Sequence, residues 1–126
     1  MSANAAKPAK HYAIINSQST FHAGIGKEAL DAALILASYE LKVSMFFIGD
    51  GVYQIQKNQL PQEISHKDYV ATFQALEFYD IEDIYICKAS LQARQLSEQS
   101  VFEHANIVAP ADIKQSLADC DVVLTF

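Results

Sequence analysis

The sequence predicts a three-layer α/β/α domain, Rossmann-like or flavodoxin-like, with a mostly parallel sheet of about five strands. Two observations indicate this fold class. Short apolar runs alternate with segments of helical periodicity from His11 to the last residue. The runs are continuously apolar, which is typical of strands buried on both faces of a parallel sheet. We expect residues 11–126 to form this single domain, after a mobile, polar and alanine-rich lead at residues 1–10.

The first part of the domain begins with a strand and a helix. Residues 11–16 (HYAIIN) form a short apolar run and predict the first strand. Lys27–Leu41 predicts a helix, because its apolar residues recur at helical spacing along one face. These apolar residues are Leu30, Ala33, Leu34, Ala37 and Leu41. A second strand is expected at Val43–Ile48, where the turn signal Gly49-Asp50-Gly51 stops it.

The middle of the chain is harder to assign. Val52–Ile64 contains Pro61 and is expected to be a loop with one helical turn. Helical periodicity returns over Ser65–Tyr79, and serine is a favoured residue at the start of a helix. A third buried strand is expected at Ile84–Cys87 (IYIC).

The last part of the chain alternates in the same way. A short helix is expected at Ser90–Gln95 and a very short strand at Asn106–Val108. Pro110 opens a helix that runs to about Ala118, because proline is favoured in the first turn of a helix. Asp121–Phe126 (DVVLTF) predicts the last strand.

Composition limits the functions that the chain can have. The net charge is −6 and the pI is near 5.0. No cluster of Lys and Arg is visible, so we expect no direct contact with nucleic acid. The first residues lack the apolar core of a signal peptide, and the longest apolar run, Ala32–Ala37, is too short to cross a bilayer. We therefore expect no membrane partner, and a cytoplasmic protein whose two cysteines are reduced.

Ligands and reactive groups in this fold class gather beyond the carboxyl ends of the strands. Cys87 is the most interesting residue there, because it closes a strand and precedes a helix. The positive end of a helix favours the thiolate, the form of cysteine that carries sulfur, and Lys88 is adjacent. Cysteine is also among the most often buried residue types, so Cys87 either carries sulfur or packs in the core. The other residues expected at this edge are Asn16, Ser17, Gln18, Ser19, Thr20, His22, Asp50, Gly51, Tyr53 and Ser90.

The second cysteine, Cys120, precedes the last strand and should lie at the opposite edge of the sheet. No helix begins there to activate it, so we interpret it as structural. The two cysteines are 33 residues apart and the four histidines are isolated, so we expect no metal site.

A glycine pattern suggests two alternative functions. Gly24 to Ala29 matches the GxGxxG/A pattern of dinucleotide-binding proteins, and Asp50 follows 21 residues after Ala29. Seven residues separate Gly24 from the first strand, however, whereas the fingerprint requires a tight turn directly after it. A nucleotide-binding module that uses Gly24 and Gly26, and a flavodoxin-like flavin carrier, are the alternatives. We expect neither cofactor, and interpret the glycines as shaping a loop and a helix start.

Six segments carry motifs that no general rule of the fold requires. They are GKEALDA at 26–32, FFIGDGVYQ at 46–54, KDYVATF at 67–73, YDIE at 79–82, ICKASL at 86–91 and DVVLTF at 121–126. Together they resemble the TusC/DsrF branch of the DsrE-like sulfur-relay family. The combination of FFI-x-DGV with DY-x-ATF is specific, and the resemblance runs from about His11 to the end.

The resemblance implies a five-stranded α/β/α fold and a place in a heterohexamer with TusB-like and TusD-like subunits. In that relay, persulfide sulfur arrives from TusA, passes through the complex to TusE and reaches a tRNA thiolase. The product is the 2-thiouridine of the wobble nucleotide mnm5s2U, whereas a DsrEFH version serves sulfur oxidation.

The resemblance also bears on the role of the cysteine. The sulfur carrier of the family is the cysteine of the TusD-like subunit, and Cys87 lies at the corresponding strand end. The TusC-like role resembles that of a structural, partner-shaping subunit. We therefore do not expect the isolated chain to be an enzyme, and Cys87 is its only candidate persulfide site.

Overall fold

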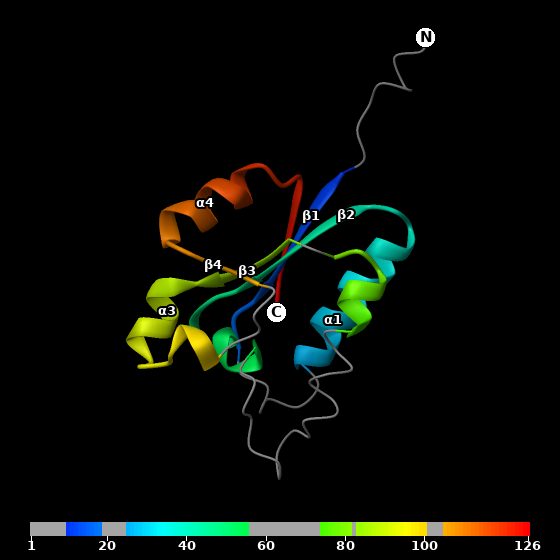
Figure 1. The fold of residues 1–126 in the computed structure, drawn as a ribbon. Coiled ribbons are helices and arrows are strands. Elements are labelled where there is room, and N and C mark those ends of the chain that lie inside the picture. The colour runs from blue at the N-terminus through cyan, green and yellow to red at the C-terminus, as the bar shows by residue number, and fades with distance from the viewer. Residues whose placement is uncertain (1–9, 19–24, 56–73, 82, 101–104) are drawn as a thin grey trace.

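The computed structural model describes residues 10–18, 25–55, 74–81, 83–100 and 105–126. Within these ranges the chain forms one sheet of five strands in the order β4-β3-β2-β1-β5 (Figure 1). The strands are β1 His11–Asn16, β2 Lys42–Phe47, β3 Asp83–Cys87, β4 Asn106–Val108 and β5 Val122–Thr125. Every strand pairing is parallel, and helices lie on both faces, which confirms the predicted fold class.

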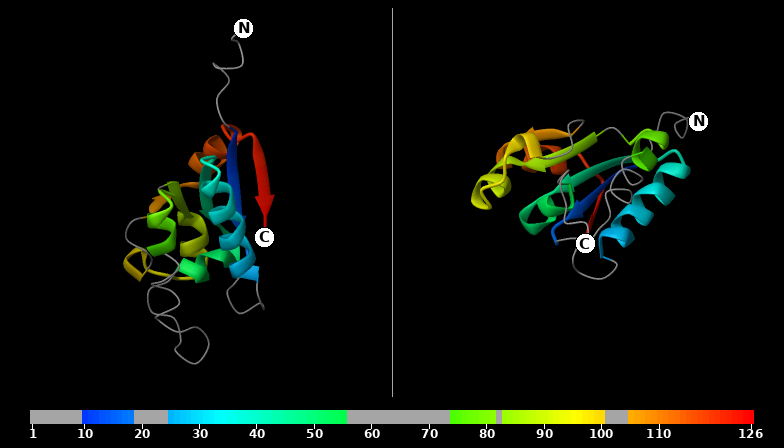
Figure 2. Two further views of the ribbon diagram at one scale, coloured as in Figure 1. Left: turned by 90° about the vertical axis from the view of Figure 1, so that its right-hand side faces the viewer. Right: turned by 60° about the horizontal axis from the view of Figure 1, so that its bottom comes forward.

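Helices follow the strands as the alternating pattern predicts. They are α1 Ile25–Ser38, the 3-10 helix η2 Gly49–Ile55, α3 Lys88–Ala93, the 3-10 helix η3 Glu98–Ser100 and α4 Pro110–Ala118. Residues 74–78 are also helical. In Figure 1, α4 lies on one side of the sheet, and α1 lies on the other beside residues 74–78. Strand β5 pairs with β1 on the side away from β2, so β1 and β5 form one flank of the sheet (Figure 2).

The core has two parts, one on each face of the sheet. The larger part buries Ile14, Met45 and Ile86 of the strands against residues of α1, η2, α3 and the helical residues 74–78. The smaller part buries Ala13, Ile15, Phe46 and Cys87 against Ile113 of α4. Among the described residues, α4, a helix of nine residues, covers the second face.

Strand and helix limits differ slightly from the predicted ones. The first strand, the short strand Asn106–Val108 and the helix that Pro110 opens are found as predicted. The limits of the other strands shift by one residue, because the pairing between strands decides where each strand begins and ends. Lys42 joins β2 by pairing with His11, and Asp83 joins β3 by pairing with Ser44. The expected mobile lead at 1–10 lies outside the described residues except for Lys10, as do residues 56–64 and 65–73.

Three helices end before the predicted residue, and for the same physical reason. The predicted helix to Leu41 ends at Ser38, because Glu40 adopts the left-handed conformation with φ of 61°. The amide of Glu40 donates to the Ala37 carbonyl and that of Leu41 to the Leu36 carbonyl, the two bonds of a Schellman motif. Asp80 and Gln95 end the helix at 74–78 and α3 in the same way, with φ of 59° and 55°. Helix α3 also begins two residues early, directly after Cys87.

Candidate functional site

The carboxyl ends of β1, β2 and β3 meet at one edge of the sheet, as the sequence predicts. Asn16 ends β1 and Ser17 follows it, the Gly49–Gly51 turn follows β2, and Ser90 of α3 follows β3. Contacts between these loops hold the edge together. Ser19, Thr20 and His22, which the sequence also predicts there, lie outside the described residues.

The Gly49–Gly51 turn packs directly on the end of β1. A Cβ atom at Gly51 would lie 1.8 Å from the carbonyl oxygen of Asn16, so only glycine fits. The Ile48 amide donates to that same Asn16 carbonyl at 3.1 Å. The Asp-Gly motif at the end of β2 therefore has a structural explanation in the close approach of two backbones.

Polar groups at the start of η2 and in and after α3 also bond to one another at this edge. Arg94 donates from Nε and Nη2 to the Asp50 carboxylate at 3.1 and 2.9 Å, and from Nη1 to the Ser90 carbonyl. The Gly49 amide donates to the Ser90 hydroxyl at 2.9 Å. Asp50 is the acidic residue that the dinucleotide pattern would assign to a ribose, and Arg94 already engages it. This pairing does not favour the nucleotide-binding alternative.

The polar residues at the end of β1 also make hydrogen bonds that hold this edge together. Asn16 is buried and donates from its side-chain amide to the Phe46 carbonyl at 3.2 Å. The Ser17 hydroxyl and amide both donate to the Phe126 carbonyl, at 2.8 and 2.9 Å. These bonds tie the last residue of the chain to the end of β1.

Cys87 is at the predicted place in the chain, but its side chain lies in the core. Its backbone forms the N-cap of α3, and the side chain makes no capping hydrogen bond. The residue is 7% exposed and packs in the smaller core cluster, which includes Phe46 and Ile113. The Lys88 ammonium, which the sequence places next to the thiol, pairs with Glu98 at 3.9 Å. These contacts favour the packing interpretation of Cys87.

Cys120 lies at the other edge of the sheet, as predicted, and is half-buried beside the same cluster. Its thiol donates to the Ser116 carbonyl at 3.4 Å. Burial raises the pKa of the Cys120 thiol, and the carboxylates of Asp119 and Asp121 raise it further, whereas Lys42 lowers it. A raised pKa keeps the thiol protonated and unreactive at neutral pH, which supports a structural role.

Sequence reasoning missed a polar network on the sheet face that α4 covers. His11 Nε2 lies 2.7 Å from the hydroxyl of Ser44, which is buried and donates to Asp83 at 3.5 Å. Lys42 pairs with the same Asp83 carboxylate at 3.8 Å. The partners lie on three strands far apart in the chain, so only the register of the sheet brings them together.

Two features are absent from the ranges that the structure describes. In those ranges no three or more His, Cys, Asp or Glu side chains are placed to hold a metal ion. No helix in those ranges is both long and apolar enough to cross a membrane.

The chain is a parallel five-stranded α/β/α domain whose third strand ends at a cysteine. Residues 10–126 match the DsrE/DsrF-like family. The chain belongs to this family, which confirms the resemblance that the sequence motifs indicate.

Two curated relatives are similar to this chain over most of its length. The chain is 38% identical to the TusC homolog of Aliivibrio fischeri over 101 residues, 80% of this chain and 86% of that protein. It is 39% identical to the TusC protein of Escherichia coli over 118 residues, 93% of this chain and 99% of that protein.

Solved structures agree on the fold. The ychN protein of E. coli superposes with a TM-score of 0.76 at 21% identity, covering 94% of this chain and 100% of that one. A Methanobacterium thermoautotrophicum protein of unknown function superposes with a TM-score of 0.66 at 10% identity, with the same coverage. At these identities the likeness concerns the fold alone.

Proposed function

We propose that the chain is a cytoplasmic subunit of a sulfur-relay complex that supplies persulfide sulfur for 2-thiolation of the wobble nucleotide mnm5s2U in tRNA. The observation that carries this proposal is the similarity to two TusC proteins over most of the chain. The TusC names favour tRNA thiolation over the sulfur-oxidation version of the relay. The acidic charge of the chain fits a subunit that acts through protein partners rather than on tRNA directly.

The proposed partners are TusB-like and TusD-like subunits in a heterohexamer, with TusA delivering sulfur and TusE accepting it. In each transfer, a thiolate attacks the terminal sulfur of a persulfide, the S–S bond breaks and the donor leaves as a thiolate. Such a step requires that the two sulfur atoms meet. Cys87 is 7% exposed and faces the apolar side chains under α4, so it is poorly placed for this encounter in the isolated chain.

The proposed role of the chain is therefore to shape the complex, while the TusD-like subunit carries the sulfur. Co-expression with TusB-like and TusD-like chains, followed by affinity purification, tests membership of the complex. We expect all three chains to purify together in constant ratio, and deletion of the gene to abolish 2-thiouridine in tRNA. Unchanged tRNA thiolation in the deletion strain would contradict the proposal.

A further inference from the structure

The amino edge of the sheet carries a groove that the relay chemistry does not use. It lies where β2 and β3 begin, between the ends of α1 and of the helical residues 74–78, and has a volume of about 530 Å³. This volume falls within the range of roughly 300–1,000 Å³ that binding pockets occupy. Apolar side chains line it, among them Leu41, Val43 and Ile81. We call it the amino-edge groove.

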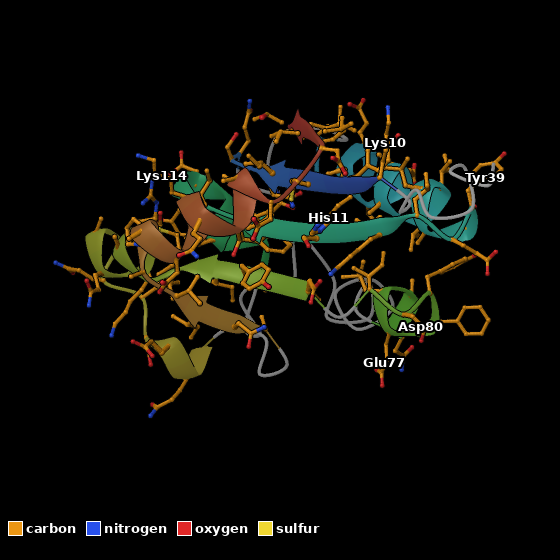
Figure 3. The ribbon with its side chains drawn as sticks, turned by 90° about the horizontal axis from the view of Figure 1, so that it is seen from above. Lys10, His11, Tyr39, Glu77, Asp80 and Lys114 are labelled. Carbon is orange, nitrogen blue, oxygen red and sulfur yellow. The ribbon has the colours of Figure 1, made fainter. Side chains whose placement is uncertain are left out.

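Acidic residues line this groove. Glu40 and Asp80 line it at the two helix ends, and Glu77 lies beside Asp80 (Figure 3). Asp83 lines it at the start of β3, but its carboxylate is engaged by Ser44 and Lys42. Lys42 is the one cation among the lining residues, and it pairs with Asp83. Within the described residues, neither Glu40 nor Asp80 has a cationic partner.

The helix end beside the groove adds negative potential. The carboxyl end of a helix carries a partial negative charge, which Lys, Arg or His in the last turn usually offsets. The last turn of α1 contains no basic residue, and Glu40 follows it. Residues 74–81 contain no basic residue either. Neither of these two helix ends therefore has a basic residue of its own to offset its negative charge.

Exposed aromatic side chains flank the acidic groove. Tyr39 is 74% exposed, Phe78 80% and Tyr79 40%, and Ile35 lies one helical turn before Tyr39 with 59% exposed. Among the described residues, Val123 is the one other large apolar side chain so exposed. The Phe78 and Tyr79 rings contact each other edge to face, with centroids 5.4 Å apart. Large apolar side chains exposed beside a groove are typical of interaction sites.

We infer that the amino-edge groove binds a segment of a partner protein that carries arginine or lysine together with apolar side chains. The carboxylates would pair with its cations, an arginine would stack on the exposed rings, and its apolar side chains would enter the groove. A second copy of this chain fits less well, because its net charge of −6 would repel this edge. This docking would be independent of which sulfur pathway the protein serves.

Titration of the full-length ¹⁵N-labelled chain with a capped pentapeptide of alternating arginine and leucine tests the inference. We expect saturable shifts of amide signals at residues 35–43 and 77–83, weaker at high salt. A matched pentapeptide of glutamate and leucine should cause no saturable shifts. Absence of saturable binding by the arginine peptide, or binding that maps to another surface, would overturn the inference.

Two variants distinguish the contribution of the carboxylates from that of the exposed aromatic ring. Glu40→Gln with Asp80→Asn should raise the dissociation constant about fivefold, since two exposed charge pairs are lost. Phe78→Ala should weaken binding at least as much, through loss of an aromatic anchor. Both changes are at exposed positions, so the fold should be kept.

Matched controls lie elsewhere on the molecule. Asp112→Asn with Asp119→Asn removes the same charge at the two ends of α4, and Val123→Ala removes an exposed apolar side chain on β5. Neither should change peptide binding, and an equal effect of the controls would overturn the inference. A concentration-dependent dimer of the chain alone that Phe78→Ala dissolves would also overturn it, because the occupant would then be a second copy.

Discussion

Polar side chains at the carboxyl edge of the sheet are engaged in hydrogen bonds and an ion pair, whereas Glu40 and Asp80 at the amino edge line a groove and have no cationic partner among the described residues. Arg94 closes on Asp50, and Gly51 packs on Asn16 with no space for a side chain. The general rule for this fold class places ligands at the carboxyl edge. In this chain the contacts at the carboxyl edge hold the loops together, and the amino edge is the surface that we propose for partner binding.

The largest effect is expected from breaking the carboxyl edge at Gly51. Gly51→Ala would place Cβ 1.8 Å from the Asn16 carbonyl oxygen, so two backbones must separate. We expect a loss of roughly 3–5 kcal/mol in the free energy of unfolding, measured by urea denaturation. Gly49→Ala is the control: its Cβ would meet no atom closer than 3.8 Å, and only its φ of 55° is unfavourable, which costs about 1 kcal/mol. Equal losses in the two variants would contradict the packing at Gly51.

The two cysteines should respond differently to the same substitution. Cys87→Ser places a hydroxyl among buried apolar side chains and should cost about 2 kcal/mol of stability. Cys120→Ser should cost about 1 kcal/mol or less, because the new hydroxyl can still donate to the Ser116 carbonyl. Urea denaturation of both variants measures the difference. A greater cost at Cys120 would show that the burial of the two thiols has been assigned in the wrong order.

Alkaline pH should weaken the face that α4 covers. Burial raises the pKa of Cys120 above its usual 9.0 and, with the charge of Asp83, that of Tyr85 above 10.0. The protonated forms are therefore favoured in the folded state, and their stabilising contribution is complete below the unfolded values. It is lost as the pH rises through the raised values, so the urea midpoint should fall above about pH 9. The double variant Cys120→Ser with Tyr85→Phe should flatten this fall, and an unchanged slope would contradict the assignment.

The smallest effect is expected at the end of α1. Glu40→Gly should stabilise the fold by about 0.5–1 kcal/mol, because glycine adopts a positive φ without steric cost. Glu40→Gln keeps the strained backbone and should change stability little. Thermal unfolding of both variants against the parent distinguishes the backbone effect from the charge effect, and equal stabilisation by Gln and Gly would assign it to charge.

The strands were predictable because each is a continuous apolar run, and the sheet type followed from those runs. Helix ends were less predictable, because the residues that stop them are Glu40, Asp80 and Gln95 rather than glycine. A left-handed residue of this kind leaves no signal in the sequence. Its conformation is fixed by the contacts of the following residue, such as Ile81 in the larger core cluster.

The candidate site was predictable in position but not in orientation. The end of a strand places Cys87 next to a helix, and the sequence shows this directly. Which face its side chain occupies depends on the register of β3 against β2, where Phe46 pairs with Tyr85. The Arg94–Asp50 pair joins residues 44 positions apart, and no local pattern predicts it.

The proposal that this chain shapes the relay without carrying sulfur is tested most directly by Cys87→Ala. The change removes one buried heavy atom and should cost about 1 kcal/mol, so the complex should still assemble. The measurement is the 2-thiouridine content of tRNA from a strain whose only copy of the gene carries Cys87→Ala, with co-purification of the partner chains as the assembly control. We predict that most 2-thiouridine is retained. Loss of most 2-thiouridine while the complex remains intact would contradict the account and identify Cys87 as a sulfur carrier of the relay.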